Sequence, residues 1–292
     1  MPHSGLILKA VSSFYYIEDD TGRDLCCRAR GKFRLNGLEP TPGDRIQYEI
    51  DENHPGYGVL VDVEPRRNYF IRPNIANVDQ ILFVASEARP KTDPYLIDKL
   101  SVAAKSHGID FLLCINKNDL VKGDSLAKIY QNSGMTVFQT SAVTGEGMDL
   151  LYRSLKNRIS VFTGNSGVGK TSLLNELLPG LQLETAEISQ KHGRGKHTTR
   201  QTELFRLPDS GWIADSPGFA SLELSMLADI KYQELSSCFP EFPEGKCRFP
   251  DCLHIREPSC EVRRNVESGL ISEIRYQSYL RMIHELKNPE RS

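Results

Sequence analysis

The chain has 292 residues, and 36 Lys and Arg against 38 Asp and Glu leave a formal net charge of -2. With 39% hydrophobic and 25% charged residues, the composition excludes a disordered chain, a polycation and a small disulfide-linked scaffold. The length is sufficient for two or three domains with a sizeable core, and any nucleic-acid binding must depend on local charge.

Hydropathy and the first residues indicate a soluble protein. The longest apolar runs, 81–85 and 111–115, are far shorter than the roughly 20 residues that a membrane-spanning helix needs. The opening Met1–Gly5 does not have the charged and then apolar pattern of a signal peptide. We therefore expect a cytoplasmic protein.

Short β-type runs separated by turn residues fill the first part of the chain, residues 1–65. The runs are 6–11, 14–17, 25–33, 44–50 and 57–63, and turn signals such as Asp-Thr-Gly and Pro-Gly lie between them. Five short strands predict an OB-type β-barrel, a fold that often binds oligonucleotides, with an SH3-like barrel as the alternative.

Basic side chains gather around the third of these runs, with Asp24 as the only acid among them. They are Arg23, Arg28, Arg30, Lys32 and Arg34. Residues that alternate along a strand share a face, so we expect these cations to form a surface that follows a phosphate backbone. The alternative is an ordinary solvated strand face.

The middle of the chain, residues 66–225, has the pattern of a parallel α/β domain. Buried strands are expected at 78–85, 111–115, 136–139, 159–163 and 211–214, and helices near 95–107, 124–133, 147–157 and 169–178. Strands that alternate with helices in this way predict a parallel sheet covered by helices, which makes the chain a multidomain α/β protein.

The last part, residues 226–292, contains cysteines followed by a helical stretch. Apolar residues recur at roughly helical spacing and are expected to form a packing face. They are Val266, Leu270, Ile271, Ile274, Tyr279, Met282, Ile283 and Leu286.

A phosphate-loop motif lies between the expected strand 159–163 and the expected helix 169–178. It comprises Gly164, Asn165, Ser166, Gly167, Val168, Gly169, Lys170 and Thr171, and Ser172 follows it. The glycines allow backbone N–H groups to approach phosphate oxygens at a helix N-terminus. Lys170 is expected to reach the β- and γ-phosphates as a catalytic residue, and Thr171 to bind magnesium (Mg²⁺).

A second motif specifies the base. Asn116, Lys117 and Asp119 follow the expected strand 111–115, where a carboxylate can accept hydrogen bonds from the N1–H and 2-amino groups of guanine. Adenine has neither donor, so Asp119 favours GTP over ATP. Ser141 and Ala142 follow a later strand and are expected to form a second turn that contacts the base.

Two further segments resemble nucleotide switches. Asp215 ends the strand 211–214 and is expected to hold Mg²⁺ through water, while the Gly218 N–H contacts the γ-phosphate; the alternative is an ordinary Pro-Gly turn. The basic segment 188–200 contains no acid and favours a mobile loop in which Thr199, or Thr198 beside it, completes the Mg²⁺ shell when GTP is bound. A plain flexible basic loop is the alternative.

Near the C-terminus, Cys247, Cys252, His254 and Cys260 supply three thiolates and one imidazole. This set is complete for a tetrahedral structural zinc ion and leaves no open position for catalysis. The spacing departs from the usual C-x2-C hairpin, and a group of buried free thiols is the alternative. Arg248, Arg256, Arg263 and Arg264 near these ligands could meet RNA, but Asp251, Glu257 and Glu261 weaken that interpretation.

The order of the motifs is unusual. In ordinary GTPases the phosphate loop precedes the guanine motif, whereas here 116–119 and 140–142 come before 164–171. The GTPase domain is therefore expected to be circularly permuted. With the barrel before it, the cysteine cluster after it, and the segments 194–200 and 215–219, the chain resembles the RsgA/YjeQ family of small ribosomal subunit-dependent GTPases along nearly all of its length.

This resemblance implies GTP hydrolysis, a Cys-Cys-His-Cys zinc module with one zinc per chain, and a role in late maturation of the small (30S) ribosomal subunit. The partners would be that subunit and its 16S rRNA, with hydrolysis stimulated by the subunit and coupled to release, and we expect a monomer. A GTP-gated RNA-binding protein with negligible turnover and a nucleotide-dependent kinase are the alternatives, and the kinase fits poorly because base-recognition and switch motifs are all present.

One position predicts slow intrinsic turnover. Phe219 lies where Ras-type enzymes have a glutamine that orients the attacking water, and an apolar ring cannot do this. His197 is our candidate for that catalytic role, and the alternative is that it contacts RNA or solvent.

Overall fold

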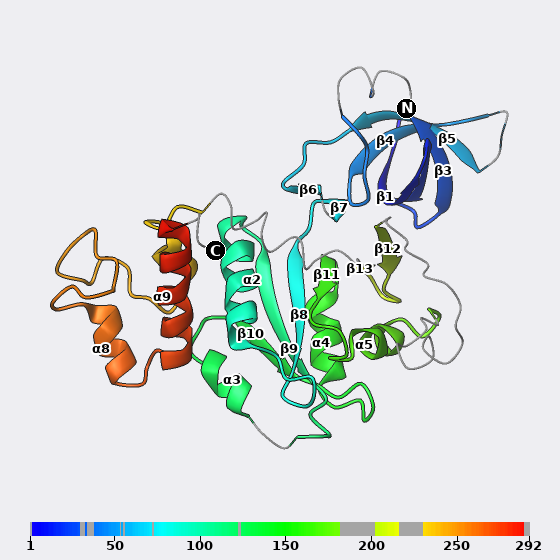
Figure 1. Cartoon of the computed structure of the whole chain (residues 1–292). Helices are drawn as coiled ribbons and strands as arrows, with labels where there is room; N and C mark the ends of the chain where they lie inside the picture. The colour runs from blue at the N-terminus through cyan, green and yellow to red at the C-terminus, as the bar shows by residue number, and fades with distance from the viewer. Residues whose placement is uncertain are drawn as a thin grey trace. The chain divides into compact units, whose positions relative to one another are not determined.

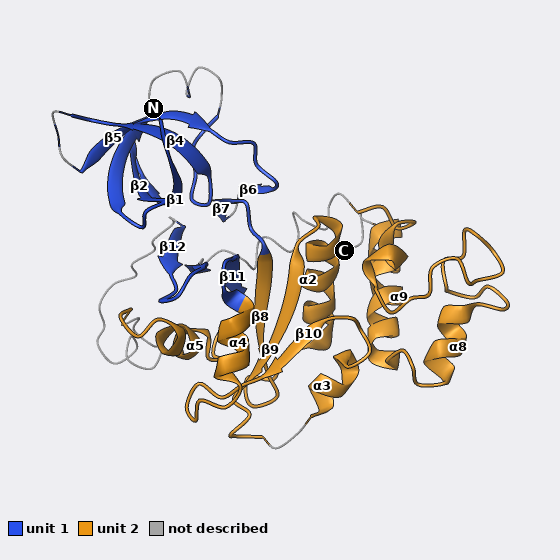
Figure 2. Ribbon diagram, turned by 180° about the vertical axis from the view of Figure 1, so that it is seen from behind, with its two compact units in different colours: residues 1–79, 155–162, 187–219 blue, residues 80–154, 163–186, 220–292 orange. Residues whose placement is uncertain are grey.

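The computed structural model describes residues 2–29, 33, 38–52, 54, 56–71, 73–121, 124–181, 202–215 and 230–288. The chain divides into two compact units, each assembled from three segments, which Figure 2 shows in different colours. The first unit comprises Met1–Asp79, Leu155–Phe162 and Glu187–Phe219. The second comprises Gln80–Ser154, Thr163–Ala186 and Ala220–Ser292. No helix in the described part of the chain is long and apolar enough to cross a membrane.

The first unit contains a closed five-stranded barrel (Figure 1). Its strands are β1 (His3–Val11), β2 (Phe14–Asp19), β3 (Asp24–Ala29), β4 (Arg45–Ile50) and β5 (Tyr57–Val63). β1 pairs antiparallel with β2 and β4, β3 pairs parallel with β5, and the order β1-β2-β3-β5-β4 closes on itself. This five-stranded barrel is the OB-type architecture that the spacing of the strands predicts.

Alternation along the strands builds the interior of the barrel. Ile7, Ile17, Ile46, Tyr48 and Leu60 are at most 1% exposed and form one buried cluster. Cys27 of β3, also fully buried, belongs to the same cluster, so all five strands contribute side chains to the core.

The basic surface expected around β3 is only partly present among the described residues. Arg23 precedes β3, and its guanidinium is bonded to Asp19, so the prediction that it shares a face with the other cations is wrong. Arg28 is exposed on β3, with its guanidinium carbon 4.9 Å from the centre of the Phe14 ring. Arg30, Lys32 and Arg34 lie outside the described residues.

Three more strands of the first unit follow one another in space. β11 (Ile159–Thr163) pairs parallel with β13 (Trp212–Asp215), which pairs antiparallel with β12 (Glu203–Arg206). β12 in turn contacts β1, where Lys9 Nζ lies 2.7 Å from a Glu203 carboxylate oxygen. The sequence analysis did not predict β12, nor the short hairpin of β6 (Tyr69–Ile71) and β7 (Asn74–Ala76).

The second unit holds the parallel strands β8 (Gln80–Ser86), β9 (Asp110–Asn116) and β10 (Thr136–Gln139). Every residue of β8 is buried, as expected for a parallel strand covered on both faces. The helices are α2 (Pro94–Ser106), α3 (Ser125–Tyr130), α4 (Met148–Leu155) and α5 (Lys170–Leu177). Asp93 caps α2 by accepting a hydrogen bond from the Tyr95 amide, and Pro94 occupies its first turn.

The C-terminal part of this unit contains the 3-10 helix η2 (Leu235–Cys238) and the helices α8 (Glu261–Glu267) and α9 (Glu273–Lys287). α9 packs against α2, and Tyr279, Met282 and Ile283 belong to a buried cluster with η2 and α8 (Figure 1). Leu270 and Ile274 are 55% and 46% exposed, so the expected packing face is wrong at these two positions. The helical conformation is interrupted between α8 and α9, where Gly269 has a φ of 77°. The helical spacing of the apolar residues therefore does not continue from one helix to the next.

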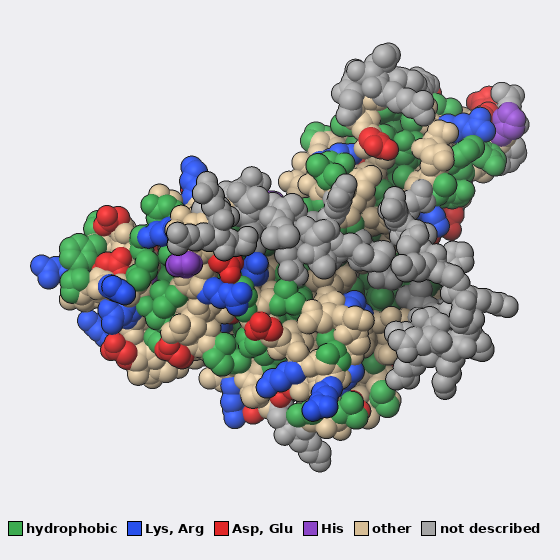
Figure 3. Space-filling view, in the orientation of Figure 1, with side chains coloured by type: hydrophobic (Ala, Val, Ile, Leu, Met, Phe, Trp, Pro, Cys, Tyr) green, Lys and Arg blue, Asp and Glu red, His purple; other side chains and the backbone are tan. Residues whose placement is uncertain are grey.

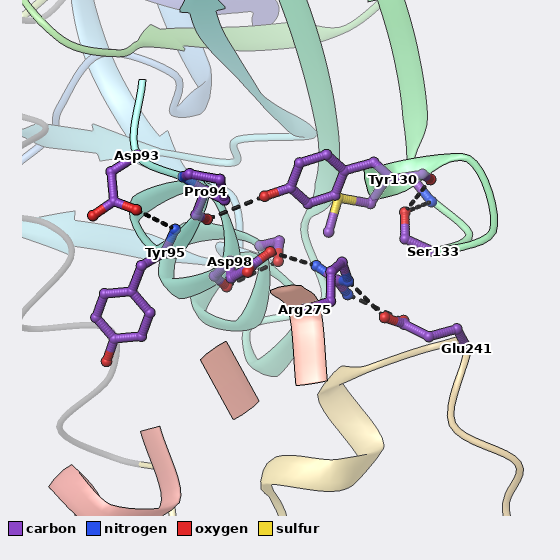
Figure 4. A network of polar contacts seen from close by, with 10 residues as sticks. Asp93, Pro94, Tyr95, Asp98, Tyr130, Ser133, Glu241 and Arg275 are labelled. Carbon is purple, nitrogen blue, oxygen red and sulfur yellow. Dashed lines mark hydrogen bonds and ion pairs between the residues drawn. The ribbon is translucent and has the colours of Figure 1, made fainter. Parts of the chain in front are cut away.

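A buried charge network fastens α9 to α2. Arg275 donates to Asp98 at 2.7 Å and to both carboxylate oxygens of Glu241 at 2.6 and 3.1 Å, and Figure 4 shows its guanidinium between the two acids. The guanidinium carbon also lies 4.9 Å from the centre of the Phe239 ring and 5.4 Å from that of Tyr130. Because a buried charge is costly unless it is paired, this arrangement specifies how the C-terminal helices seat on α2.

Candidate nucleotide and metal sites

The loop 164–169 connects β11 to α5 and adopts a conformation that requires glycine. Gly164, Gly167 and Gly169 have φ values of 140°, 80° and 98°, which side chains rarely adopt. A Cβ atom at Gly164 would collide with the carbonyl of Val84, and one at Gly169 would collide with the Asn116 amide. The glycine spacing of the motif is thus matched to close packing against β8 and β9.

Lys170 begins α5 and folds back over the loop. Its Nζ donates to the carbonyl oxygens of Gly164 at 2.6 Å and Asn165 at 2.7 Å. Thr171 is half-buried and Ser172 is exposed on the first turn of the same helix, where the helix dipole favours an anion. The ammonium group and the helix N-terminus therefore lie at one end of the loop.

The guanine motif and the phosphate loop are joined by direct hydrogen bonds. Asn116, at the end of β9, is 3% exposed, and its Nδ2 donates to the Val168 carbonyl at 3.0 Å. Lys117 has a φ of 67°, and its Nζ donates to the Gly167 carbonyl at 2.6 Å. Two motifs about 50 positions apart in the sequence thus form one site.

The third motif completes this cluster. The Ser141 hydroxyl donates to Asp119 Oδ1 at 2.6 Å, and the Ala142 amide donates to Asn116 Oδ1 at 3.3 Å. Ser141 is fully buried while Asp119 is exposed, so a buried hydroxyl orients a carboxylate that a ligand can reach. Such a carboxylate accepts hydrogen bonds and gives none, which suits a ligand edge made of donors.

Sequence analysis missed one contributor to the site, the segment between β8 and α2. The Arg89 carbonyl accepts a hydrogen bond from Lys117 Nζ at 3.2 Å, and a Cβ at Gly167 would lie 3.3 Å from the Pro90 ring. No motif marks these residues, because the contacts use a backbone oxygen and a ring edge.

The remaining candidate residues are only partly described. Asp215 ends β13 with its Cα opposite Phe162 of the parallel strand β11, one residue before that strand ends; nothing is described of its side chain. Thr199, Thr198, His197, Gly218 and Phe219 lie outside the described residues.

The cysteine–histidine cluster is compact. The candidate ligand atoms of Cys247, Cys252, His254 and Cys260 all lie within 4.8 Å of one another. His254 Nδ1 is 3.6 Å from the sulfur of Cys247 and 3.3 Å from that of Cys260, and these two sulfurs are 4.0 Å apart. Zn–S and Zn–N bonds of about 2.3 and 2.0 Å at tetrahedral angles produce separations of this size, so the residues fit zinc.

Surrounding residues hold the cluster in shape. The Glu261 amide donates to the Cys247 sulfur at 3.4 Å, and the Tyr276 hydroxyl on α9 donates to the His254 carbonyl at 2.6 Å. Burial lowers the pKa of His254, which favours the neutral imidazole that a metal requires. Glu257 accepts hydrogen bonds from three backbone amides of the same loop, Leu253, Ile255 and Arg256, so this acid is structural.

Basic and acidic side chains mix on the surface of this C-terminal module, as Figure 3 shows on its left side. Arg264 pairs with Glu261 at 2.9 Å, whereas Arg248 and Arg256 are exposed. The RNA contact expected for these arginines therefore stays a prediction.

Comparison with known proteins decides the family. A family model described as "RsgA GTPase" matches residues 63–225, and one described as "RsgA N-terminal domain" matches residues 4–57. The chain belongs to the RsgA GTPase family. The small ribosomal subunit biogenesis GTPase RsgA of Moorella thermoacetica is 44% identical over 292 residues, covering 99% of each chain. The RsgA protein of Thermotoga maritima is 42% identical over 288 residues, covering 97% of this chain and 96% of that protein.

Solved structures of RsgA relatives have the same fold. The crystal structure of YjeQ from Thermotoga maritima matches 98% of this chain and 99% of its own length with a TM-score of 0.84 and 39% identity. That of YloQ, described as a circularly permuted GTPase, covers 99% of this chain and 96% of its own with a TM-score of 0.80 and 34% identity. The predictions of an N-terminal barrel, a permuted GTPase domain and a C-terminal cysteine–histidine cluster with helices are confirmed.

Proposed function

We propose that this protein hydrolyses GTP in the cytoplasm during late maturation of the small ribosomal subunit, and that the subunit stimulates hydrolysis, which is coupled to release. The observation that carries this is the hydrogen bond from Asn116 to the Val168 carbonyl, which unites the guanine motif and the phosphate loop. Full-length similarity to proteins named small ribosomal subunit biogenesis GTPases supports the choice of partner.

In this proposal the base is held by the cluster around β9. Asp119 accepts hydrogen bonds from guanine, and Ser141 holds that carboxylate in place. Lys117 joins the guanine motif to the phosphate loop through the Gly167 carbonyl, while the hydrogen bond from the Ala142 amide to Asn116 fixes the second base-contacting turn to the guanine motif. A carboxylate left unpaired by adenine makes ATP a poor ligand.

The phosphates bind at the loop 164–169, whose backbone amides and the side chain of Lys170 face the β- and γ-phosphates. Hydroxyl and carboxylate oxygens are the ligands that Mg²⁺ prefers, so Thr171, Asp215 and Thr199 are the residues that would hold it. When bound, Mg²⁺ neutralises charge on the β- and γ-phosphate oxygens. The Gly218 amide contacts the γ-phosphate and thereby makes the segment after β13 sensitive to hydrolysis.

Water orientation is the step that this chain supplies least well. Phe219 has no polar group, so we assign this role to His197 or to a group of the ribosomal subunit, and Thr199 orders the segment that contains His197. Intrinsic turnover is therefore slow and stimulated turnover fast.

We assign the three-domain division 1–65, 66–225 and 226–292 to barrel, GTPase and zinc module, in a monomer whose partners are the 30S subunit and its 16S rRNA. Cys247, Cys252, His254 and Cys260 would hold one structural zinc, which keeps the loop before α8 folded. The Lys9–Glu203 ion pair fixes β12 to the barrel. β12 in turn pairs with β13, the strand that ends at Asp215.

The decisive experiment measures phosphate release with and without purified small subunits. We expect slow hydrolysis alone and strong stimulation by the subunit, and His197→Ala should lower the stimulated rate far more than GTP affinity. Subunit binding should be salt-sensitive and tighter with a non-hydrolysable GTP analogue than with GDP. Absence of stimulation would instead favour the second candidate, a GTP-gated RNA-binding protein with negligible turnover, because Phe219 has no group that orients water.

A further inference from the structure

The outer face of the barrel carries a slot between two exposed tyrosines. Tyr16 on β2 and Tyr57 on β5 are 47% and 44% exposed. Both are register partners of Cys26 on β3, which lies between them and is half-buried. Large aromatic side chains thus flank a small one along a single row across three strands.

The spacing of this row suits a planar ring. Neighbouring strands lie about 4.8 Å apart, so the backbones that carry Tyr16 and Tyr57 are separated by about 10 Å. A base stacked between two aromatic rings needs about 7 Å, which is twice the 3.4 Å separation of stacked bases. The slot can therefore accept one base, with Cys26 as its floor.

A second row on the same face adds a cation and another ring. Arg28 pairs with Phe14 on one side and Val59 on the other, and its guanidinium lies over the Phe14 ring at 4.9 Å. Arg28 lies two positions along β3 from Cys26 and so faces the same way. Bases of single-stranded nucleic acids stack on surfaces of this kind, in which aromatic rings alternate with the planar guanidinium of arginine.

The edges of the face argue against binding of a duplex. A groove of about 750 Å³ includes Tyr16, Cys26 and Tyr57 and is bordered by Asp24 and by the Lys9–Glu203 ion pair. Acidic groups at the rim would repel the phosphates that a duplex presents outward, whereas an unpaired base enters with its apolar faces. The surface therefore selects bases more than backbone.

We propose that the row Tyr16–Cys26–Tyr57 is a stacking site for one unpaired base of single-stranded RNA, with Arg28 and Phe14 continuing the surface. This interpretation rests on the proposed function only for the source of the RNA. To the basic strand of the sequence analysis it adds a site in which stacking is the main contribution to affinity.

The test uses the full-length zinc-loaded protein and a fluorescently labelled oligoadenylate of eight nucleotides, read by anisotropy. Because each alanine substitution removes one base–ring stack, Tyr16→Ala and Tyr57→Ala should each weaken binding about tenfold. Tyr16→Phe should bind like the unaltered protein, and so should Tyr69→Ala, which removes a tyrosine that is 42% exposed on β6 outside this face. Unchanged affinity in both alanine variants of the row would overturn the proposal.

Two further measurements locate the ligand. Bound oligoadenylate should slow alkylation of Cys26 by N-ethylmaleimide, followed by mass spectrometry, and should do so much less in Tyr57→Ala. The proposal of an RNA stacking site would be contradicted if a duplex of the same length competed as well as the single strand. It would also be contradicted if AMP, at the same concentration of bases, competed as well as the oligonucleotide. GTP hydrolysis should stay normal in these variants. Because the binding assay contains no ribosomal subunit, its result does not depend on whether the proposed function is correct.

Discussion

Arg275 on α9 and Asp98 on α2 form an ion pair of 2.7 Å, with their side chains only 1% and 0% exposed. Burial raises the pKa of Asp98, and the positive charge of Arg275 opposes this rise. Each charge depends on the other, because neither has access to water. The pair therefore controls whether the C-terminal module stays seated on the GTPase fold.

Replacing Arg275 with leucine should lower the free energy of unfolding by about 3–5 kcal/mol, since it strands the buried carboxylate of Asp98. Urea denaturation followed by circular dichroism measures this. Arg264→Ala is the matched control, because Arg264 is 65% exposed in its pair with Glu261 and should change stability by less than about 0.5 kcal/mol. Equal effects of the two substitutions would show that the buried pair carries no special stability.

Asp119→Asn should move base preference from guanine toward xanthine, because an amide can donate to the oxygen that replaces the 2-amino group. GTP affinity should fall about 100-fold or more, since two hydrogen bonds to a charged group are worth about 1.5–3 kcal/mol each. Nucleotide titration calorimetry with GTP, XTP and ATP measures the change. Asn118→Ala, whose side chain bonds only to Glu146 among the described residues, should keep GTP preference. Equal binding of ATP and GTP by the unaltered protein would contradict the assignment of Asp119.

Lys170→Ala should abolish turnover for practical purposes: the rate of GTP hydrolysis should fall roughly 100-fold or more. The substitution removes the ammonium that neutralises charge developing on the phosphates. The barrel and the zinc module should remain folded, since the Lys170 side chain bonds to Gly164 and Asn165 within its own loop. Phosphate release and the thermal unfolding profile are compared in parallel. Hydrolysis at the normal rate would place the active site elsewhere.

Elemental analysis should find one zinc per chain in protein purified without chelator. Cys252→Ala should lose most of the metal and make the C-terminal module mobile, while GTP binding survives. Cys238→Ala is the control, because this buried thiol lies in η2 outside the cluster and its loss should leave zinc content unchanged. Stoichiometric zinc in Cys252→Ala would remove that residue from the ligand set.

The stability of the barrel should depend on the ionisation of Asp19. Burial by itself would raise its pKa, but hydrogen bonds from Thr21 and Arg23 outweigh burial and hold the pKa well below the usual range. A depressed pKa in the folded state gives stability that is complete above about pH 4 and is lost as the pH falls further. The stability difference between the unaltered protein and Asp19→Asn should therefore shrink below pH 4 in urea titrations. Asp24→Asn, which changes an exposed neighbour, is the matched control and should change the free energy of unfolding by little.

Local patterns in the sequence determined much of this protein. The expected strands 78–85, 111–115 and 159–163 lie within two residues of β8, β9 and β11, because a strand buried on both faces must be apolar throughout. The glycines of 164–169 and the order of the motifs were also sufficient to predict a permuted GTPase, since these requirements concern backbone conformation and sequence order alone.

Only the tertiary structure decided the partners of individual polar groups. Arg23 was expected to be one of several surface cations, yet its guanidinium is bonded to Asp19. No sequence motif marks Arg275, yet it is buried between Asp98 and Glu241. The short strand β12 likewise depends on β13 and β1 for its hydrogen bonds. Periodicity records which face of an element is apolar, whereas pairing across 177 positions, as between Asp98 and Arg275, results from long-range packing that no local pattern encodes.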